Sequence, residues 1–166
     1  EIEAGLLAGT LDCAVHSLKD VPSTLPEGLV LGAILEREDA RDALVAPPGA
    51  TLAGLARGAR VGTSSLRRQA QLLALRPDVT VLPLRGNVDT RLRRFRAGDF
   101  DALLLAAAGL QRLGLAGEIR ERLQPEQFLP AAGQGVLAIE CRAEDAATRA
   151  RLQPLHHPPT ALAVAA

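Results

Sequence analysis

Residues 59–106 read ARVGTSSLRRQAQLLALRPDVTVLPLRGNVDTRLRRFRAGDFDALLLA, and this stretch decides the fold class. Short apolar runs alternate in it with longer segments whose apolar residues have helical spacing. We expect strands at 59–62, 79–84 and 101–106, and helices at 66–75 and 88–97. Strands and helices that alternate in this way form βαβ units, so the sequence predicts an α/β protein with a largely parallel sheet.

The pattern is less regular on either side of this stretch. We expect a short helix at 108–113, brief strands at 11–15, 28–35, 43–46 and 136–141, and helices at 1–9, at 144–152 and after His156-His157. Residues 41–129 hold the strands of a nearly complete α/β unit, whereas 1–40 and 130–166 hold too few to close a sheet. The sequence therefore predicts two lobes, with 41–129 inserted into a partial first lobe made of 1–40 and 130–166.

The charge is balanced in total but uneven along the chain. The 166 residues contain 19 basic and 19 acidic groups, yet residues 57–96 contain ten arginines and two acids, a net charge of +8. Only one basic residue is a lysine, Lys19. Aromatic residues make up 2% of the chain, which argues against stacking on single-stranded nucleic acid. No helix-turn-helix or zinc pattern accompanies the basic segment, so we expect no nucleic-acid partner.

Other bulk features exclude further classes. No apolar run is long enough to span a membrane, and the N-terminus lacks the layout of a signal peptide. Cys13 and Cys141 lie in apolar, strand-like runs without the spacing of a metal site, so we expect buried free thiols in a reducing cytoplasm. His156-His157 precedes two prolines and is interpreted as the entry to a last helix rather than as metal ligands. We therefore expect a cytoplasmic protein with no membrane partner and no metal.

Arginines follow several of the expected strands. In open α/β sheets, ligands bind beyond the carboxyl ends of the strands, where helix N-termini also point. The hydroxyl run Thr63-Ser64-Ser65 precedes one such helix, with Ser65 as its expected N-cap. We expect five arginines at this edge, where they would suit several carboxylates or a polyphosphate: Arg67, Arg68, Arg85, Arg91 and Arg112.

The alternative for any single arginine is an ordinary ion pair or a side chain that covers a helix. Six others are expected on the solvated surface: Arg57, Arg60, Arg76, Arg93, Arg94 and Arg96.

Lys19-Asp20 follows the first expected strand of the other lobe. One interpretation is a turn with an ordinary ion pair. The other is functional, because a carboxylate at a strand end can stabilise a developing cation or transfer a proton.

Five ordered motifs carry a resemblance to a known family. They are HSLKDVP at 16–22, GTSSLRRQ at 62–69, RGNVDTR at 85–91, AGLQRLG at 108–114 and PAAGQG at 130–135. With these motifs, the sequence closely resembles the porphobilinogen deaminase (hydroxymethylbilane synthase) family. The resemblance covers almost the whole chain and implies a two-lobed α/β architecture like that of periplasmic binding proteins.

The resemblance also implies an activity and a site. The family joins four porphobilinogen units head to tail, with loss of ammonia, on a dipyrromethane cofactor held by a cysteine thioether. By motif match, Asp20 is the catalytic carboxylate, and Arg91 and Arg112 contact the substrate, the cofactor or the growing chain. The same match implies these cofactor contacts: Lys19, Thr63, Ser65, Arg67, Arg68, Arg85 and Gln134. The substrate would be porphobilinogen and the intact enzyme a monomer.

Some parts of the family pattern are missing from this chain. Leu18 stands where the family often has Met, and the chain contains no Met at all. We expect an internal fragment, with a further N-terminal segment before Glu1 and a cofactor-carrying C-terminal domain after Ala166. Cys141 is not the cofactor cysteine, which the family places in a Gly-Gly-Cys setting. The isolated chain is therefore expected to be inactive and to lack the covalent cofactor.

Two other functions compete with this one. Two α/β lobes with clustered arginines also describe a non-enzymatic anion- or carboxylate-binding module, although such a receptor would gain nothing from Asp20 beside its ligand. Nucleic-acid binding by the +8 segment would require a steep salt dependence of DNA affinity.

Overall fold

The computed structural model describes residues 1–165, and these form two compact units. Unit 1 comprises Glu1–Glu38 and Ala132–Ala166, and unit 2 comprises Asp39–Ala131. The boundaries expected from the sequence each lie two residues away from these. Within residues 1–165, no helix is both long and apolar enough to cross a bilayer.

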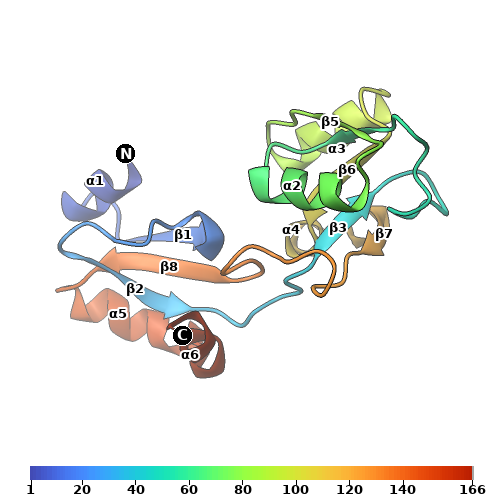
Figure 1. Cartoon of the computed structure of the whole chain (residues 1–166). Helices are drawn as coiled ribbons and strands as arrows, with labels where there is room; N and C mark the ends of the chain where they lie inside the picture. The colour runs from blue at the N-terminus through green and yellow to red at the C-terminus, as the bar shows by residue number, and fades with distance from the viewer. Residues whose placement is uncertain (166) are drawn as a thin grey trace. The chain divides into compact units, whose positions relative to one another are not determined.

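Unit 2 is a five-stranded sheet with helices on both faces (Figure 1). Its strands, in the spatial order β5-β4-β6-β3-β7, are β3 (Asp42–Val45), β4 (Arg60–Gly62), β5 (Thr80–Leu82), β6 (Ala102–Ala106) and β7 (Ile119–Arg122). Its helices are α2 (Leu66–Leu75), α3 (Val88–Arg96), α4 (Ala107–Arg112) and the 3-10 turn η2 (Ala116–Glu118). Alternate residues of β6 enter two separate cores, one with Leu72 of α2 and the other with Leu92 of α3. Strands buried on both faces explain the continuous apolar run at 102–106.

The direction of β3 differs from the prediction of a largely parallel sheet. β4 pairs in parallel with β5 and β6, as expected from the alternation of strands and helices. β3 lies between β6 and β7 and runs antiparallel to both. The regular alternation begins only at β4, so it did not constrain β3. The sheet is mixed, and the first residue of β3, Asp42, pairs with Ala106 at the carboxyl end of β6.

Strand β7 was not predicted at all. Its four residues, Ile-Arg-Glu-Arg, contain one apolar side chain, and β7 lies at the edge of the sheet. An edge strand needs little apolar patterning, because one of its sides is free of a neighbour.

Unit 1 is a three-stranded antiparallel sheet with β8 in the centre (Figure 1). The strands, in the order β1-β8-β2, are β1 (Cys13–Ser17), β2 (Leu29–Ile34) and β8 (Leu137–Arg142). The helices are α1 (Ile2–Leu7), α5 (Ala146–Leu152), α6 (Pro158–Ala165) and two 3-10 turns, η1 (Leu18–Asp20) and η3 (Gln153–Leu155). α6 begins directly after His156-His157, as expected.

Two expectations for unit 1 are wrong. The first strand begins at Cys13 rather than at Leu11, because the exposed Leu11 side chain belongs to the turn before it. Cys141 is buried in the core beside Leu152, as expected, but Cys13 is exposed. Both cysteines face each other across the β1–β8 register, yet β1 is an edge strand and leaves Cys13 open to solvent.

Arg76 was expected on the solvated surface, but its side chain is largely buried and binds backbone carbonyls of unit 2. Its side chain is 14% exposed and donates to the carbonyls of Leu52, Ala53 and Leu55. It also forms two hydrogen bonds with Asp78, and these lower the pKa of that carboxyl to about 2. A guanidinium has five N–H donors, so one side chain can fix a whole turn of backbone.

Gly62, the last residue of β4, is expected to tolerate no side chain. A Cβ there would lie 2.7 Å from Leu103 Cδ2 and 2.9 Å from Phe100 Cδ1. We expect Gly62→Ala to lower the free energy of unfolding by about 1–3 kcal/mol, as measured by urea titration. Gly109→Ala is the control: apart from its chain neighbours and the backbone of α4 itself, no atom lies within 4 Å of its Cβ position, so alanine should stabilise the helix by about 0.5–1 kcal/mol. Equal stability of the two variants would contradict the packing argument.

Candidate functional site

The carboxyl end of β4 carries the hydroxyl run of the second motif. Thr63 is buried, and its Oγ1 accepts a hydrogen bond from the amide of Ser65 at 3.2 Å. Ser64 Oγ exchanges hydrogen bonds with the amide and carbonyl of Leu84, which fixes the end of β4 to the end of β5. Ser65 caps α2 through the amide of Arg68, as predicted. These bonds hold the first turn of α2 at the edge where the parallel strands end.

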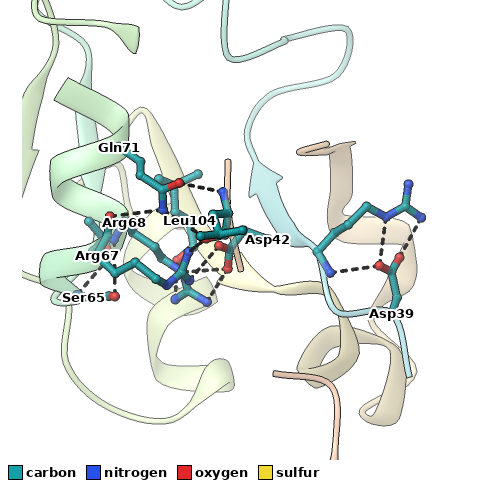
Figure 2. Close-up of polar contacts among 10 residues, drawn as sticks. Asp39, Asp42, Ser65, Arg67, Arg68, Gln71 and Leu104 are labelled. Atoms are coloured by element: carbon teal, nitrogen blue, oxygen red, sulfur yellow. Dashed lines mark hydrogen bonds and ion pairs between the residues drawn. The ribbon is translucent and has the colours of Figure 1, made fainter. Parts of the chain in front are cut away.

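Two arginines of that first turn bind one buried carboxylate. Figure 2 shows Arg67 and Arg68 reaching from α2 to Asp42. Asp42 is 0% exposed; its Oδ2 lies 2.7 Å from Arg67 and its Oδ1 2.7 Å from Arg68. Arg68 is itself buried and also donates to the carbonyl of Leu104. Arg67 is half-buried, so it can still present part of its guanidinium to a ligand.

Arg91 adds a third guanidinium to this region. It lies in α3, half-buried, and its Nε donates to the carbonyl of Gly86 at 2.7 Å. Burial, together with the neighbouring charge of Arg68, lowers the pKa of Arg91 from its ordinary value. No carboxylate within residues 1–165 forms an ion pair with Arg91. Arg67 and Arg68 thus bind Asp42, whereas Arg91 lies in the same region without an ion pair among residues 1–165, which makes this a positively charged surface suited to an anionic ligand.

The other predicted arginines of unit 2 lie on the surface. Arg85 and Arg112 are both exposed, at the ends of the segments that follow β5 and β6. Gly86, directly after Arg85, has a φ of +106°, a backbone conformation that favours glycine. Asn87 then caps α3 by accepting a hydrogen bond from the amide of Thr90, as its position suggested.

Unit 1 brings two of the motifs side by side. Lys19 and Asp20 are exposed in η1, directly after β1. The amide of Leu18 donates to the carbonyl of Val136, which ties η1 to the segment around the buried Gln134. Gly133 allows this approach, because a Cβ at that position would lie 3.0 Å from Leu18 Cγ. The Lys19-Asp20 turn and the Gln134 loop are thus held together within one unit.

Asp20 lines a pocket of about 390 Å³ within unit 1. The same pocket is lined by His16 of β1 and by the buried Glu140 of β8, whose side chains are 2.8 Å apart. Lys19 lines a different groove, of about 740 Å³, with Arg37 and Gly133. Within the described part of the chain, no group of three or more His, Cys, Asp or Glu side chains is arranged to hold a metal ion.

The residues that sequence reasoning missed are acidic or paired with acids. Asp42 was missed because the expected strand began at Ala43 and its direction was not constrained, so nothing placed Asp42 at the carboxyl end of β6. A signal was present, since an aspartate beginning the fully buried run Asp42–Val45 needs a cationic partner. The pairing of His16 with Glu140 had no sequence signal, because the two residues are 124 positions apart.

Comparison with solved structures supports the fold. A periplasmic substrate-binding protein of an ABC transporter from Coxiella burnetii aligns with 97% of this chain and 77% of its own, with a TM-score of 0.60 and 15% identity. A lipoprotein from Bacillus subtilis aligns with 95% of this chain and 75% of its own, with a TM-score of 0.60 and 13% identity. At these identities, the likeness shows the two-lobed α/β fold alone.

Comparison of sequences shows the family. The model described as "Porphobilinogen deaminase, dipyromethane cofactor binding domain" matches residues 1–150. The porphobilinogen deaminase of Roseiflexus sp. is 57% identical over all 166 residues, which are 55% of its length. That of Nitratidesulfovibrio vulgaris strain Hildenborough is 58% identical, again over the whole chain and 53% of its own length. The chain thus spans about half the length of these curated relatives, and it belongs to the porphobilinogen deaminase family.

Proposed function

We propose that the protein containing this chain joins four porphobilinogen units, with release of ammonia, into the linear tetrapyrrole hydroxymethylbilane. The observation that carries the proposal is the charge imbalance at the carboxyl edge of the unit 2 sheet. There, Arg67 and Arg68 bind the carboxylate of Asp42, and Arg91, which forms no ion pair within residues 1–165, adds a further positive charge. Each pyrrole of the product carries an acetate and a propionate, so a growing chain is a polycarboxylate that such a surface would bind.

The same positive charge supports a fit to the dipyrromethane cofactor. Its carboxylates would take the excess positive charge around Arg67, Arg68 and Arg91, and its remaining proposed contacts are Lys19, Thr63, Ser65, Arg85 and Gln134. When bound, this group supplies the pyrrole end to which substrate units are added. Arg68 has a second task in this proposal, because it already neutralises the buried Asp42. The ion pair holds the Arg68 side chain in place, so we propose it as a fixed contact for the cofactor rather than a contact that moves with the growing tetrapyrrole.

Asp20 is proposed as the catalytic carboxylate. Loss of ammonia from the aminomethyl group leaves an electron-poor pyrrole with cationic character. An anionic group beside the ring nitrogen stabilises that charge as it develops. Asp20 is exposed at the end of η1, on a turn held by the Leu18–Val136 hydrogen bond. That setting gives an exposed carboxylate on a turn whose backbone is held in place.

The proposal is tested by the full-length protein with porphobilinogen as the only substrate. We expect four ammonia molecules released per tetrapyrrole, formation of uroporphyrin-type products, and a protein mass increased by one dipyrromethane. This chain alone is expected to show neither turnover nor the mass increase, since the proposed cofactor cysteine lies in a further C-terminal domain. Binding of small carboxylates without any turnover by the full-length protein would favour the carboxylate-binding module instead. The cytoplasmic location and monomeric state remain parts of the same proposal.

A further inference from the structure

We infer that His16, oriented by Glu140, is a proton-transfer group for the coupling reaction, acting in the pocket that Asp20 also lines. The inference rests on the proposed function and adds a second titratable side chain to it.

The two side chains form a pair across neighbouring strands. In the antiparallel register of β1 and β8, His16 lies opposite Ala138 and Glu140 opposite Ala14. Residues two apart in a strand share one face, so His16 and Glu140 are diagonal neighbours on the same face of the sheet. His16 Nε2 and Glu140 Oε2 are 2.8 Å apart.

Burial fixes the direction of this hydrogen bond. The Glu140 side chain is 2% exposed, and its Oε1 has no hydrogen-bond partner among residues 1–165. His16 Nε2 therefore provides the one hydrogen bond to a buried carboxylate, and a carboxylate can only accept. The imidazole is held with its proton on Nε2, which leaves the lone pair on Nδ1 to accept a proton. Within residues 1–165, Nδ1 has no hydrogen-bond partner, and the His16 side chain is 23% exposed.

The pocket around His16 is lined by acidic side chains. Its other titratable lining side chains are carboxylates, contributed by α1 and its N-cap (Glu1, Glu3), η1 (Asp20) and β8 (Glu140). No basic side chain other than His16 lines it. A proton that reaches Nδ1 of His16 thus enters a pocket whose other side chains include four carboxylates.

The coupling reaction requires one such acceptor. The C–N bond of the protonated aminomethyl group breaks, and its electron pair leaves with nitrogen as ammonia. A C–C bond then forms to the α-carbon of the accepting pyrrole, and that carbon must lose its proton. His16 Nδ1 accepts this proton and passes it to the departing ammonia, so the step releases one ammonium ion and needs no other reactant. Asp20 stabilises the cationic ring, and His16 moves the proton.

The test uses the full-length protein and three variants. His16→Gln keeps a polar side chain but cannot take up the proton, and we expect kcat to fall about 100-fold or more, with the cofactor mass retained. Glu140→Gln removes the negative charge that accepts the hydrogen bond of His16 Nε2. The acidic limb of its pH profile of kcat should therefore move to lower pH. His157→Gln is the matched control, a half-buried histidine of the same unit bonded to Thr160, and should leave the profile unchanged.

A second measurement is independent of turnover. In ¹⁵N spectra of histidine-labelled full-length protein, His16 should be the Nε2–H tautomer in the unmodified protein and lose that preference in Glu140→Gln. Unchanged kcat and pH profile in an active protein carrying His16→Gln would overturn the inference and leave the proposed function standing. A purely structural pair would lower thermal stability in both variants without moving the acidic limb, which would also overturn it. If the unmodified protein makes no tetrapyrrole, the proposed function fails, and the tautomer still decides whether Glu140 orients His16.

Discussion

Asp20→Asn in the full-length protein is expected to lower kcat at least ~100-fold, the size of effect seen when a charge-stabilising group is removed from an active site. Asparagine keeps the shape of the side chain but removes the negative charge that we propose opposes the cationic pyrrole. The loss should appear in kcat rather than in substrate binding, because the charge develops only during the reaction. Steady-state kinetics with porphobilinogen measures it.

The fold and the covalent cofactor should survive this substitution. Asp20 is exposed, and it forms no ion pair within residues 1–165. Asp12→Asn is the matched control, since its side chain in the same unit is 83% exposed and 3.4 Å from Arg142. It should leave kcat, the melting temperature and the protein mass unchanged. Normal turnover by Asp20→Asn would support a passive carboxylate receptor.

The second large effect concerns stability rather than catalysis. Asp42→Asn is expected to lower the free energy of unfolding by about 3–5 kcal/mol, because it removes one partner of a buried ion pair. Arg68 would remain buried without its compensating charge, beside the like charges of Arg67 and Arg91. Urea titration followed by far-UV circular dichroism measures the change.

Two comparisons separate this effect from ordinary loss of a salt bridge. Asp101→Asn breaks an exposed pair with Arg60, both side chains being more than two-fifths exposed, and should cost at most about 1 kcal/mol. Pyrophosphate should restore stability to Asp42→Asn more than to the unmodified protein, since an anion bound at the arginines replaces the lost charge. If Asp42→Asn is no more destabilising than Asp101→Asn, then Asp42 does not hold the arginines.

Local patterns predicted most of the elements but not the direction of β3. Helix α2 occupies the predicted residues because Ser65 caps it and its apolar residues keep the helical period. Helix α3 is one residue shorter than predicted, with Asn87 as its cap. These signals act over a few residues. The direction of β3 depends on which strands it meets more than fifty residues later in the chain, and no local pattern contains that information.

Sequence position selected candidate cations for the site but not its anions. Strand-end position selected Arg67, Arg68, Arg85, Arg91 and Arg112, of which the structure brings Arg67 and Arg68 onto Asp42 and leaves Arg85 and Arg112 exposed. The roles of Asp42, Glu140 and His16 depend instead on tertiary pairing, which no local pattern indicates. Arg76 is the opposite case: its position after α2 looked like surface, and only the fold shows three backbone carbonyls around it.

The central position of β8 sets the order in which this chain can fold during synthesis. β1 and β2 leave the ribosome about a hundred residues before β8, the strand that lies between them. All five strands of unit 2 are complete at Arg122, before β8 has begun. Unit 2 therefore closes first, although unit 1 is the first to be translated. Once residues 39–131 have emerged from the ribosome, the nascent chain carries a complete unit 2 behind two strands that still lack β8 between them, and those strands are what a ribosome-associated chaperone would have to protect.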